Sequence, residues 1–362
     1  MGRELYSFYY IAIGYLISFI IAPYFKLANY FRPLYKLDEI NVKVILVNEY
    51  HRIGDVLLIE PILRSLRAKF PEANIILICN KQIEQLAKHL SLADTIIGIE
   101  APWTTWSWSI KKWKSLYSFF SKDIKSRNID LAFDFKGDIR NSFFLWITKP
   151  KKSYGYSFTG GKYFFTNPQS INIKMHQQER AFHLVKKVGC IEIPQPNKSI
   201  QLGGTIVIHP GTSDIKRAWS EVYWFELIKL LTTDYDLSIV KIAASNDLLE
   251  KINSNNIKIK IFKGSLVEFS EWIKAQKLII APDSMSGHLA AYNGIPSISI
   301  FGSQDPELTC PTGSKSKIIK PKISCSHKKF HWRLCEKCML SIKPIFVYKE
   351  AIKFISEIKN KA

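Results

Sequence analysis

Residues 278–302, LIIAPDSMSGHLAAYNGIPSISIFG, are the stretch from which the fold of this chain can be argued. The expected elements are, in order, an apolar strand at Leu278–Ala281, a polar turn at Pro282–Gly287, a small-residue helix at His288–Asn293 and a second apolar strand at Ser297–Phe301. Strand, helix and strand in close succession predict a βαβ unit with a right-handed crossover. Ligands of open α/β sheets bind where such a turn follows the carboxyl end of a strand.

The polar turn of this unit carries residues suited to an anionic or hydroxyl-rich ligand. Free N–H groups at the start of a helix favour an anion, phosphate above all. Asp283 and Ser284 offer oxygen atoms beside those groups, and His288 opens the expected helix. Simple capping of the helix by Asp283 and Ser284 explains the same residues without a ligand, and both interpretations stay open.

The composition indicates a globular protein with an anionic partner. A chain of 362 residues is long for one domain, and its 47% hydrophobic content is enough for substantial cores. The formal net charge of +20 points to nucleic acid, an acidic membrane face or a phosphorylated substrate. No zinc-finger, RNP-like or GxxG pattern accompanies the charge, so we do not expect nucleic-acid binding. Strands and helices alternate along the chain, which indicates the α/β class.

The N-terminal segment Leu5–Phe25, LYSFYYIAIGYLISFIIAPYF, is apolar and has no charged residue. Its 21 residues are enough to span a bilayer, and tyrosines in its outer thirds are typical of the membrane interface. Arg3 precedes it and Lys26, Arg32 and Lys36 follow, a pattern that favours a cytoplasmic body. A spanning anchor, a helix in the plane of the membrane and a helix packed on the body remain open. We expect the protein at the cytoplasmic side of the inner membrane, anchored or monotopic through residues 5–25.

A second βαβ unit is expected near the start of the globular part. An apolar strand at Val42–Asn48 leads into the turn Ile53-Gly54-Asp55, followed by an amphipathic helix at Val56–Phe70 and a strand at Ile75–Cys79. Gly54 permits close approach of the backbone. Asp55 is either the N-cap of the helix or a carboxylate at the edge of a cleft, where it is suited to act as a general base.

Cationic and aromatic residues follow in the same half. Lys136 and Arg140 come after the expected strand Ile129–Phe135 and either point into the crevice or lie solvated on a loop. Residues 103–113 hold four tryptophans, at positions 103, 106, 108 and 113, beside two lysines. This segment suits a membrane face or a lipid-bearing substrate, and packing in a core explains it equally well.

The composition turns to Pro, Gly and Asn at residues 189–204, which we interpret as a linker between domains. We therefore expect a membrane-associating segment at 1–36 and two domains, at 37–195 and 196–362. The second half begins with a strand at Thr205–His209 and a turn that includes Thr212 and Ser213, with Lys216 and Arg217 close by. Such a turn suits phosphate, although surface charge alone also explains the two cations.

The C-terminal part contains the cysteines Cys325, Cys335 and Cys338. The pair Cys335-x-x-Cys338 is compatible with zinc or redox chemistry, but its surroundings match no standard zinc module. In a reducing cytoplasm free thiols are the default, so no metal site is predicted here.

Three segments, taken together, resemble a known family. RIGDVLLIEPILRSLRAKFPEANI, VIHPGTSDIKRAWSEVYWFELIKLL and IIAPDSMSGHLAAYNGIPSISIFGSQDPELTCP are similar, in order and spacing, to the ADP-heptose:lipopolysaccharide heptosyltransferases, glycosyltransferase family nine. The resemblance covers roughly residues 42–345 and leaves the N-terminal apolar segment outside it. It implies the GT-B fold, in which two Rossmann-like doubly wound domains face a central cleft. It also implies that 37–195 is the acceptor domain and 196–362 the nucleotide-sugar domain.

The resemblance also implies a reaction and its residues. The family makes an inverting transfer of L-glycero-D-manno-heptose from ADP-heptose to a lipid A–Kdo or heptose acceptor, with no metal and no other cofactor. Asp55 matches the family's catalytic aspartate, with Gly54, Lys136 and Arg140 on the side of the anionic lipid-linked acceptor. The donor residues implied are Thr212, Ser213, Lys216, Asp283, Ser284, Met285, Ser286, Gly287 and His288.

Two departures from the family pattern leave the donor open. Met285 stands where a glycine normally follows Asp-Ser, and Gly287 comes two residues later. The Gly-rich loop that usually contains a glutamate is AASNDLLE at residues 243–250. The alternatives are a transferase of the same fold that uses another nucleotide-sugar for a surface glycan, and a non-catalytic protein that binds lipopolysaccharide or a nucleotide.

Overall fold

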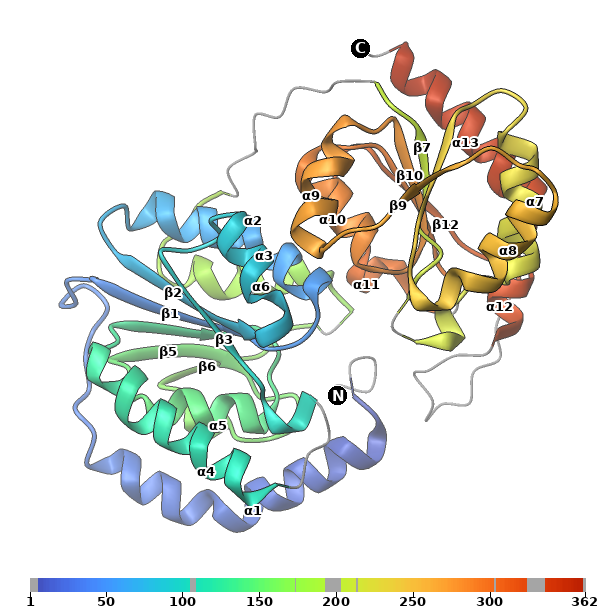
Figure 1. The fold of residues 1–362 in the computed structure, drawn as a ribbon. Coiled ribbons are helices and arrows are strands. Elements are labelled where there is room, and N and C mark those ends of the chain that lie inside the picture. Colours follow the sequence, from blue (N-terminus) through green and yellow to red (C-terminus); the bar gives the residue numbers. More distant parts are fainter. Residues whose placement is uncertain are drawn as a thin grey trace. The chain divides into compact units, whose positions relative to one another are not determined.

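The computed structural model describes residues 6–104, 109–172, 174–192, 203–212, 214–302, 304–323 and 336–360. The chain divides into two compact units, Met1–Gln195 and Pro196–Ala362 (Figure 1). Each unit is built around one parallel sheet of six strands, and each is described by itself below.

Unit 1 begins with a long helix and continues as an alternation of strands and helices. Its strands are β1 (Val44–Glu49), β2 (Asn74–Asn80), β3 (Thr95–Ile99), β4 (Leu131–Asp134), β5 (Lys152–Tyr156) and β6 (Asn167–Gln169). Its α-helices are α1 (Phe8–Tyr30), α2 (Ile53–Lys69), α3 (Glu84–His89), α4 (Ile110–Ser118), α5 (Ile139–Ile147) and α6 (Gln177–Lys186). Short 3-10 or π turns are η1 (Lys81–Ile83), η2 (Pro102–Thr104), η3 (Phe119–Ile124), η4 (Lys125–Arg127) and η5 (Lys162–Phe164).

Unit 2 has the same alternation. Its strands are β7 (Ile206–Ile208), β8 (Leu237–Val240), β9 (Lys260–Phe262), β10 (Leu278–Pro282), β11 (Ser297–Ile300) and β12 (Ser316–Ile319). Its helices are α7 (Glu221–Leu231), α8 (Asn246–Ser254), α9 (Leu266–Trp272), α10 (Met285–Asn293), α11 (Pro306–Thr309), α12 (Glu336–Leu340) and α13 (Pro344–Lys359), with 3-10 turns η6 (Ile215–Arg217), η7 (Ala243–Ser245) and η8 (Ile273–Ala275).

The two sheets have one topology. Their strand orders are β3-β2-β1-β4-β5-β6 and β12-β11-β10-β7-β8-β9, and numbering each unit from its own first strand gives 3-2-1-4-5-6 in both. This is the doubly wound Rossmann order, in which the chain reverses its winding direction between the first and fourth strands. The reversal leaves a crevice at the carboxyl ends of β1 and β4 in unit 1, and of β7 and β10 in unit 2.

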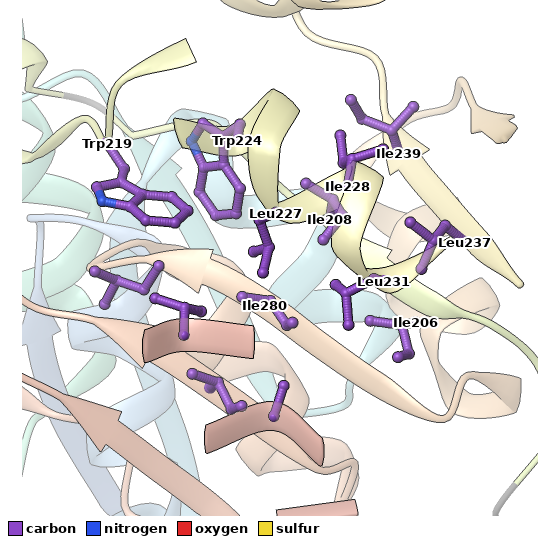
Figure 2. Close-up of a cluster of buried hydrophobic side chains, with 14 of the residues drawn as sticks. Ile206, Ile208, Trp219, Trp224, Leu227, Ile228, Leu231, Leu237, Ile239 and Ile280 are labelled. Carbon is purple, nitrogen blue, oxygen red and sulfur yellow. The ribbon is translucent and has the colours of Figure 1, made fainter. Parts of the chain in front are cut away.

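Each sheet is buried between two layers of helices, which explains its near-continuous apolar strands. In unit 1, α2 and α6 cover one face while α4 and α5 cover the other (Figure 1). In unit 2, α7, α8 and α13 pack on one face, where Trp219 and Trp224 close over Ile208, Leu227 and Ile280 (Figure 2). The α/β class predicted from the alternating pattern is confirmed.

Helix α1 lies along unit 1, beyond α5 (Figure 1). Ser7 caps its start, with its hydroxyl accepting from the Tyr10 backbone N–H at 3.4 Å. Phe25 packs against Phe143 and Trp146 of α5, with ring centroids 6.0 and 4.9 Å apart. It is the one described helix that is long and apolar enough to cross a membrane, with a mean hydropathy of 1.8, and 17% of that apolar window is buried.

Two helices begin earlier than the sequence predicts. α2 begins at Ile53, so the N-cap is Arg52, and Asp55 is in the first helical turn rather than at the cap. The Asp55 carboxylate accepts from the Arg52 backbone N–H at 3.1 Å, which closes the helix start in the way that the acidic member of a capping box does. Pro61 lies inside this helix without ending it. α10 begins at Met285 instead of His288, because Ser284 takes the extended N-cap conformation.

Candidate functional site

The candidate site in unit 1 forms where β1 and β4 end and α2 begins. Asp55 lies in the first turn of α2, and Lys136 follows β4. Lys136 Nζ donates to Asp55 Oδ1 at 2.7 Å and lies 3.7 Å from Glu49 Oε2. The side chains of Asp55 and Lys136 are 18% and 13% exposed, so the pair reaches solvent at the crevice edge. Gly54 lies in the same helical turn, one residue before Asp55.

Asp55 is held as a carboxylate. Burial by itself would raise its pKa, but the charges of Lys136 and His51 oppose this, as do hydrogen bonds from Lys136 and from the Arg52 backbone N–H. The net result is a pKa well below the ordinary value. Asp55 is therefore ionised at neutral pH and available to accept a proton.

A second carboxylate, Glu49, lies behind this pair at the end of β1. Its side chain is fully buried, and Oε1 lies 3.1 Å from His51 Nδ1. The same oxygen accepts from the His51 backbone N–H at 3.3 Å. Glu49 thus holds His51 and lies beside Lys136, the two side chains whose charges lower the pKa of Asp55.

Two further aspartates, Asp134 and Asp138, are buried beside the cluster. Asp134 ends β4 and accepts from the Lys136 backbone N–H at 3.1 Å and from the Ser142 hydroxyl at 3.3 Å. Burial raises its pKa to about 7, with a further increase from Asp138 and Glu49. Burial also raises the pKa of Asp138 to about 6. The pKa values of these two carboxyl groups are therefore shifted in the opposite direction to that of Asp55, although all three lie in the same part of the unit.

Arg140 is tied to Asp138 and to helix α1. Asp138 caps α5 by accepting from the Arg140 backbone N–H at 2.9 Å. Its carboxylate also accepts from Arg140 Nε at 3.0 Å and from a terminal nitrogen of Arg140 at 2.7 Å. The guanidinium also lies over the Tyr10 ring, 4.8 Å from its centroid, and the Tyr10 hydroxyl donates to Asp138 at 3.2 Å. Arg140 is a quarter exposed, and burial lowers its pKa to about 10, which leaves it cationic at neutral pH.

The candidate site in unit 2 forms where β7 and β10 end. Asp283 directly follows β10, and its carboxylate accepts from Arg217 of η6 at 3.0 Å. Both side chains are nearly buried, at 9% and 12% exposed. The Thr212 hydroxyl donates to the Asp283 carbonyl oxygen at 3.4 Å, which links the turn after β7 to the turn after β10.

The first turn of α10 provides backbone N–H groups at this place. Ser284 is the N-cap residue, but its side chain makes no capping hydrogen bond; its hydroxyl lies 2.9 Å from that of Ser286 instead. Met285 begins the helix, and Ser286 and His288 are buried in it. The helix start is thus not closed by its own cap, an arrangement suited to an anion.

Gly287 has a packing role in this helix. A Cβ at this position would lie 2.5 Å from the Ser299 hydroxyl of β11 and 3.1 Å from Pro311. Its missing side chain therefore allows α10 to approach the sheet, and its role in donor binding stays a prediction.

The turn after β7 brings Arg217, rather than Lys216, to Asp283. Lys216 is exposed, and its backbone N–H donates to Asp214 at 3.1 Å. Ser213, the other residue expected in this turn, lies outside the described residues.

The structure partly answers two other questions that the sequence raised, on the tryptophan-rich segment and on a metal site. Trp103 is buried and stacks on Phe144 with centroids 5.4 Å apart, which favours the core interpretation for this tryptophan. Trp106 and Trp108 lie outside the described residues. No group of three or more His, Cys, Asp or Glu side chains suited to a metal ion occurs within the described part of the chain. Cys325 and Cys335 lie beyond it, and Cys338 is buried.

Four residues of these sites were not named as candidates from the sequence: Glu49, Asp134, Asp138 and Tyr10. Arg217 was named only as a cation beside the turn after β7, and Lys216 was selected for the donor site. Glu49, Asp134 and Asp138 lie at or just after the ends of apolar strands, the position where doubly wound sheets place functional groups. That signal was present in the sequence for the three acids. Tyr10 gave no such signal, because 128 residues separate it from Asp138.

Comparisons with known proteins give a consistent result. The family model described as glycosyltransferase family 9 (heptosyltransferase) matches residues 118–338. The solved structure of Escherichia coli heptosyltransferase WaaC with ADP has a TM-score of 0.71 at 16% identity, over 86% of this chain and 99% of that one. E. coli ADP-heptose lps heptosyltransferase II has a TM-score of 0.70 at 14% identity, over 89% and 100%.

A third solved structure and the curated proteins complete the comparison. The family 9 glycosyl transferase from Veillonella parvula DSM 2008 has a TM-score of 0.71 at 16% identity, over 87% of this chain and 97% of that one. No curated protein matches the chain. At these identities the solved structures support the fold, which is the GT-B arrangement of two doubly wound units.

Proposed function

This chain belongs to glycosyltransferase family 9, and on that premise we propose that it transfers L-glycero-D-manno-heptose from ADP-heptose to a lipid A–Kdo or heptose acceptor of lipopolysaccharide. The observation that carries the proposal is the Asp55–Lys136 pair at the crevice of unit 1, an ionised carboxylate beside a cation at a solvent-reaching edge. Such a carboxylate suits a general base, and the cation suits an anionic acceptor.

In this proposal, Asp55 takes the proton from the acceptor hydroxyl as that oxygen attacks the anomeric carbon. The bond from this carbon to the diphosphate breaks, the new glycosidic bond forms on the opposite face, and the configuration inverts. A carboxylate with a depressed pKa is a weak base toward a neutral alcohol. The proton is transferred easily only as the attacking oxygen gains positive charge, which suits a transition state with oxocarbenium character.

Lys136 then has two tasks. It keeps Asp55 ionised in the free enzyme, through the 2.7 Å hydrogen bond. An acceptor carboxylate or phosphate that draws the ammonium group away from Asp55 would raise the pKa of Asp55 and make it a stronger base when substrate is bound. Arg140, cationic and a quarter exposed, is the second candidate for an anionic group of the acceptor.

We assign donor binding to the crevice of unit 2. The start of α10, which Ser284 does not cap, suits the diphosphate, and the leaving charge is stabilised by helix N–H groups without a metal. Asp283 is suited to sugar hydroxyls, with Ser286 and His288 following it at the start of α10. Thr212, bonded to the Asp283 carbonyl oxygen, and the exposed Lys216 come from the segment after β7. The apolar helix α1 supports a location at the cytoplasmic face of the inner membrane.

A transfer assay with defined substrates tests the proposal. With ADP-heptose and a Kdo-containing lipid A acceptor, we expect product of inverted configuration, formed equally well with a metal chelator present. Asp55→Asn should lower kcat by about 10²- to 10⁴-fold, while heat protection by the donor is kept. Substantial turnover by this variant would exclude the role of Asp55.

The donor is tested separately, because AASNDLLE at residues 243–250 departs from the family pattern. Heat protection by ADP-, UDP- and GDP-sugars ranks the candidates, since a ligand that binds the folded state alone raises its stability. Protection by a UDP- or GDP-sugar alone would favour transfer of another sugar to a surface glycan. Binding without turnover on any acceptor would favour a non-catalytic protein.

A further inference from the structure

Helix α1 has two different faces, and one of them is docked on unit 1. Ile11, Gly14 and Ser18 are its buried residues, spaced three and four apart so that they share one side of the helix. A Cβ at Gly14 would clash with the Thr159 carbonyl oxygen, so the glycine allows the helix to lie directly on the backbone of unit 1. The docked face is thus shaped for protein, not for lipid.

Hydrogen bonds hold this face along the whole helix. Ser18 accepts from the Gly161 backbone N–H at 2.9 Å, in the middle of α1. Near the C-terminal end, Asn29 donates to the Tyr163 carbonyl oxygen at 2.6 Å and accepts from the Trp146 indole at 2.8 Å. Near the N-terminal end, Tyr10 donates to Asp138. A helix that left unit 1 to span a bilayer would break these bonds.

The opposite face of α1 is apolar and uncovered. Phe19, Ile20 and Leu16 are 80%, 66% and 60% exposed. Other large side chains exposed along the helix are Tyr9, Ile13, Ile17, Tyr24 and Leu27. No charged residue occurs from Phe8 to Phe25. Monomeric soluble proteins rarely leave an apolar patch of this extent in contact with water.

Exposed lysines occur on α1, beyond its end, and on a second helix that packs on α5. Lys26, exposed in the last turns of α1, and Lys36 beyond its end are at one end of it. Exposed Lys111, Lys112 and Lys114 lie on α4, which packs against the same helix α5 as α1 does, through Trp113 and Phe144. Lysines beside an apolar face with tyrosines are typical of helices in the interface of an anionic leaflet.

We infer that α1 is an in-plane membrane helix: it stays docked on unit 1 by the Gly14–Ser18 face and inserts its Leu16–Phe19–Ile20 face into one leaflet of an anionic bilayer. The inference rests on the proposed function, because insertion of α1 would bring the candidate site of unit 1 close to a lipid-linked acceptor. Tyr10, which holds Asp138 and contacts Arg140, is on the same helix. The insertion of α1 therefore places the acceptor side of the site at the lipid surface.

Vesicle flotation of the full chain tests the insertion. We expect binding to vesicles of phosphatidylglycerol and phosphatidylethanolamine, with less binding to phosphatidylcholine alone. Phe19→Glu, on the uncovered face, should weaken partitioning by about 10- to 100-fold. Ile345→Glu removes an exposed apolar residue of α13, 48% exposed, and should leave partitioning unchanged. Equal partitioning of Phe19→Glu and the unchanged chain would overturn the inference.

A topology experiment distinguishes an in-plane helix from a spanning one. An epitope placed ahead of Met1 should be digested by protease added to the cytoplasmic face of inverted membrane vesicles, as the body of the protein is. Protection of the epitope while the body is cleaved would show a spanning helix and overturn the inference. A dimer in sedimentation, without vesicle binding, would show that a second copy covers the face and would overturn it as well.

The donor assay separates this inference from the proposed function. Phe19→Glu should keep heat protection by the nucleotide-sugar and transfer to a soluble, delipidated acceptor. If no nucleotide-sugar protects the unchanged chain against heat, the proposed function is refuted. Vesicle flotation of the same chain still tests the insertion of α1.

Discussion

Asp55 and Asp134 are the same residue type in one cluster, yet their surroundings have opposite effects on their charge. Lys136 donates its ammonium group to Asp55 and only its backbone N–H to Asp134. At Asp55 the ammonium group outweighs the effect of burial, so the pKa of Asp55 is lowered. At Asp134 the backbone N–H of Lys136 does not outweigh it, and the pKa rises to about 7. The position of one lysine side chain therefore decides which of the two carboxyl groups has the lowered pKa.

This difference predicts a pH dependence of stability. Between its ordinary pKa of 3.8 and about 7, Asp134 is protonated in the folded protein and ionised in the unfolded chain. The folded state then binds more protons, so the contribution of Asp134 to stability falls as the pH rises through this window, by at most about 1.4 kcal/mol per pH unit.

Asp134→Asn should remove this pH dependence of stability. Urea unfolding of the variant and of the unchanged chain measures it at pH 4.5 and pH 7.5, which lie within about one unit of the two ends of the window. Asp55 acts in the opposite direction, because its depressed pKa gives stability that is lost as the pH falls below the ordinary value. An unchanged pH slope in Asp134→Asn would contradict the assignment.

The neighbours Lys216 and Arg217 give a second prediction at this scale. Arg217→Ala would leave Asp283 buried without its ion-pair partner and should lower the free energy of unfolding by about 3–5 kcal/mol. Lys216→Ala, at an exposed position, should change it by less than about 0.5 kcal/mol. Thermal or urea unfolding of the two variants makes the comparison, and equal effects would show that the Arg217–Asp283 pair is not the stabilising one.

At the scale of elements, α1 connects the apolar surface of unit 1 to its polar site. Tyr10→Ala would remove both the hydrogen bond to Asp138 and the ring beneath the Arg140 guanidinium. We expect the acceptor KM to rise about tenfold, the effect of roughly 1.4 kcal/mol, with the donor KM and kcat little changed.

Two matched variants sharpen this test. Tyr10→Phe keeps the ring and should show a smaller effect than Tyr10→Ala. Tyr24→Ala, an exposed tyrosine of the same helix at 69% exposure, should leave the acceptor KM unchanged in a soluble-acceptor assay. A similar rise in all three variants would mean that α1 acts only through the stability of unit 1.

The starts of α2 and α10 show why element boundaries were harder to predict than elements. Asp, Ser and Gly are common both in turns and in the first turn of a helix, so composition alone placed residues 53–55 and 285–287 in turns. In the structure these residues are helical. The difference matters for the chemistry, because it points the Asp55 carboxylate at the helix start and gives Gly287 a packing role.

At the scale of the whole molecule, the two units have separate hydrophobic cores. Leu227 is fully buried in the core of unit 2, and Leu145 is fully buried in that of unit 1. Either leucine changed to alanine should destabilise its own unit by about 2–5 kcal/mol. Hydrogen exchange should show the lost protection in that unit alone; protection lost in both units after either change would indicate a single cooperative fold.

The sequence by itself determined the class of the fold and the region of each site. Alternating apolar strands and amphipathic helices can bury their faces only as helices packed on parallel sheets, and polar residues after the strands then meet at one edge. For this reason Asp55, Lys136, Arg140 and Asp283 could be selected before any coordinates. The N-terminal apolar segment could also be recognised from the sequence, because an uncharged apolar run of this length occurs mainly in membranes or in protein cores.

Only the tertiary structure decided which partner each charged group has and which face of α1 is covered. Asp55 and Lys136 are 81 residues apart, and Tyr10 and Asp138 are 128 apart, so no local pattern could pair them. Burial, which sets the pKa of Asp134 and Asp138, is likewise a property of the packed chain. Contacts between distant residues depend on how the elements pack, and packing is fixed only when the whole chain has folded.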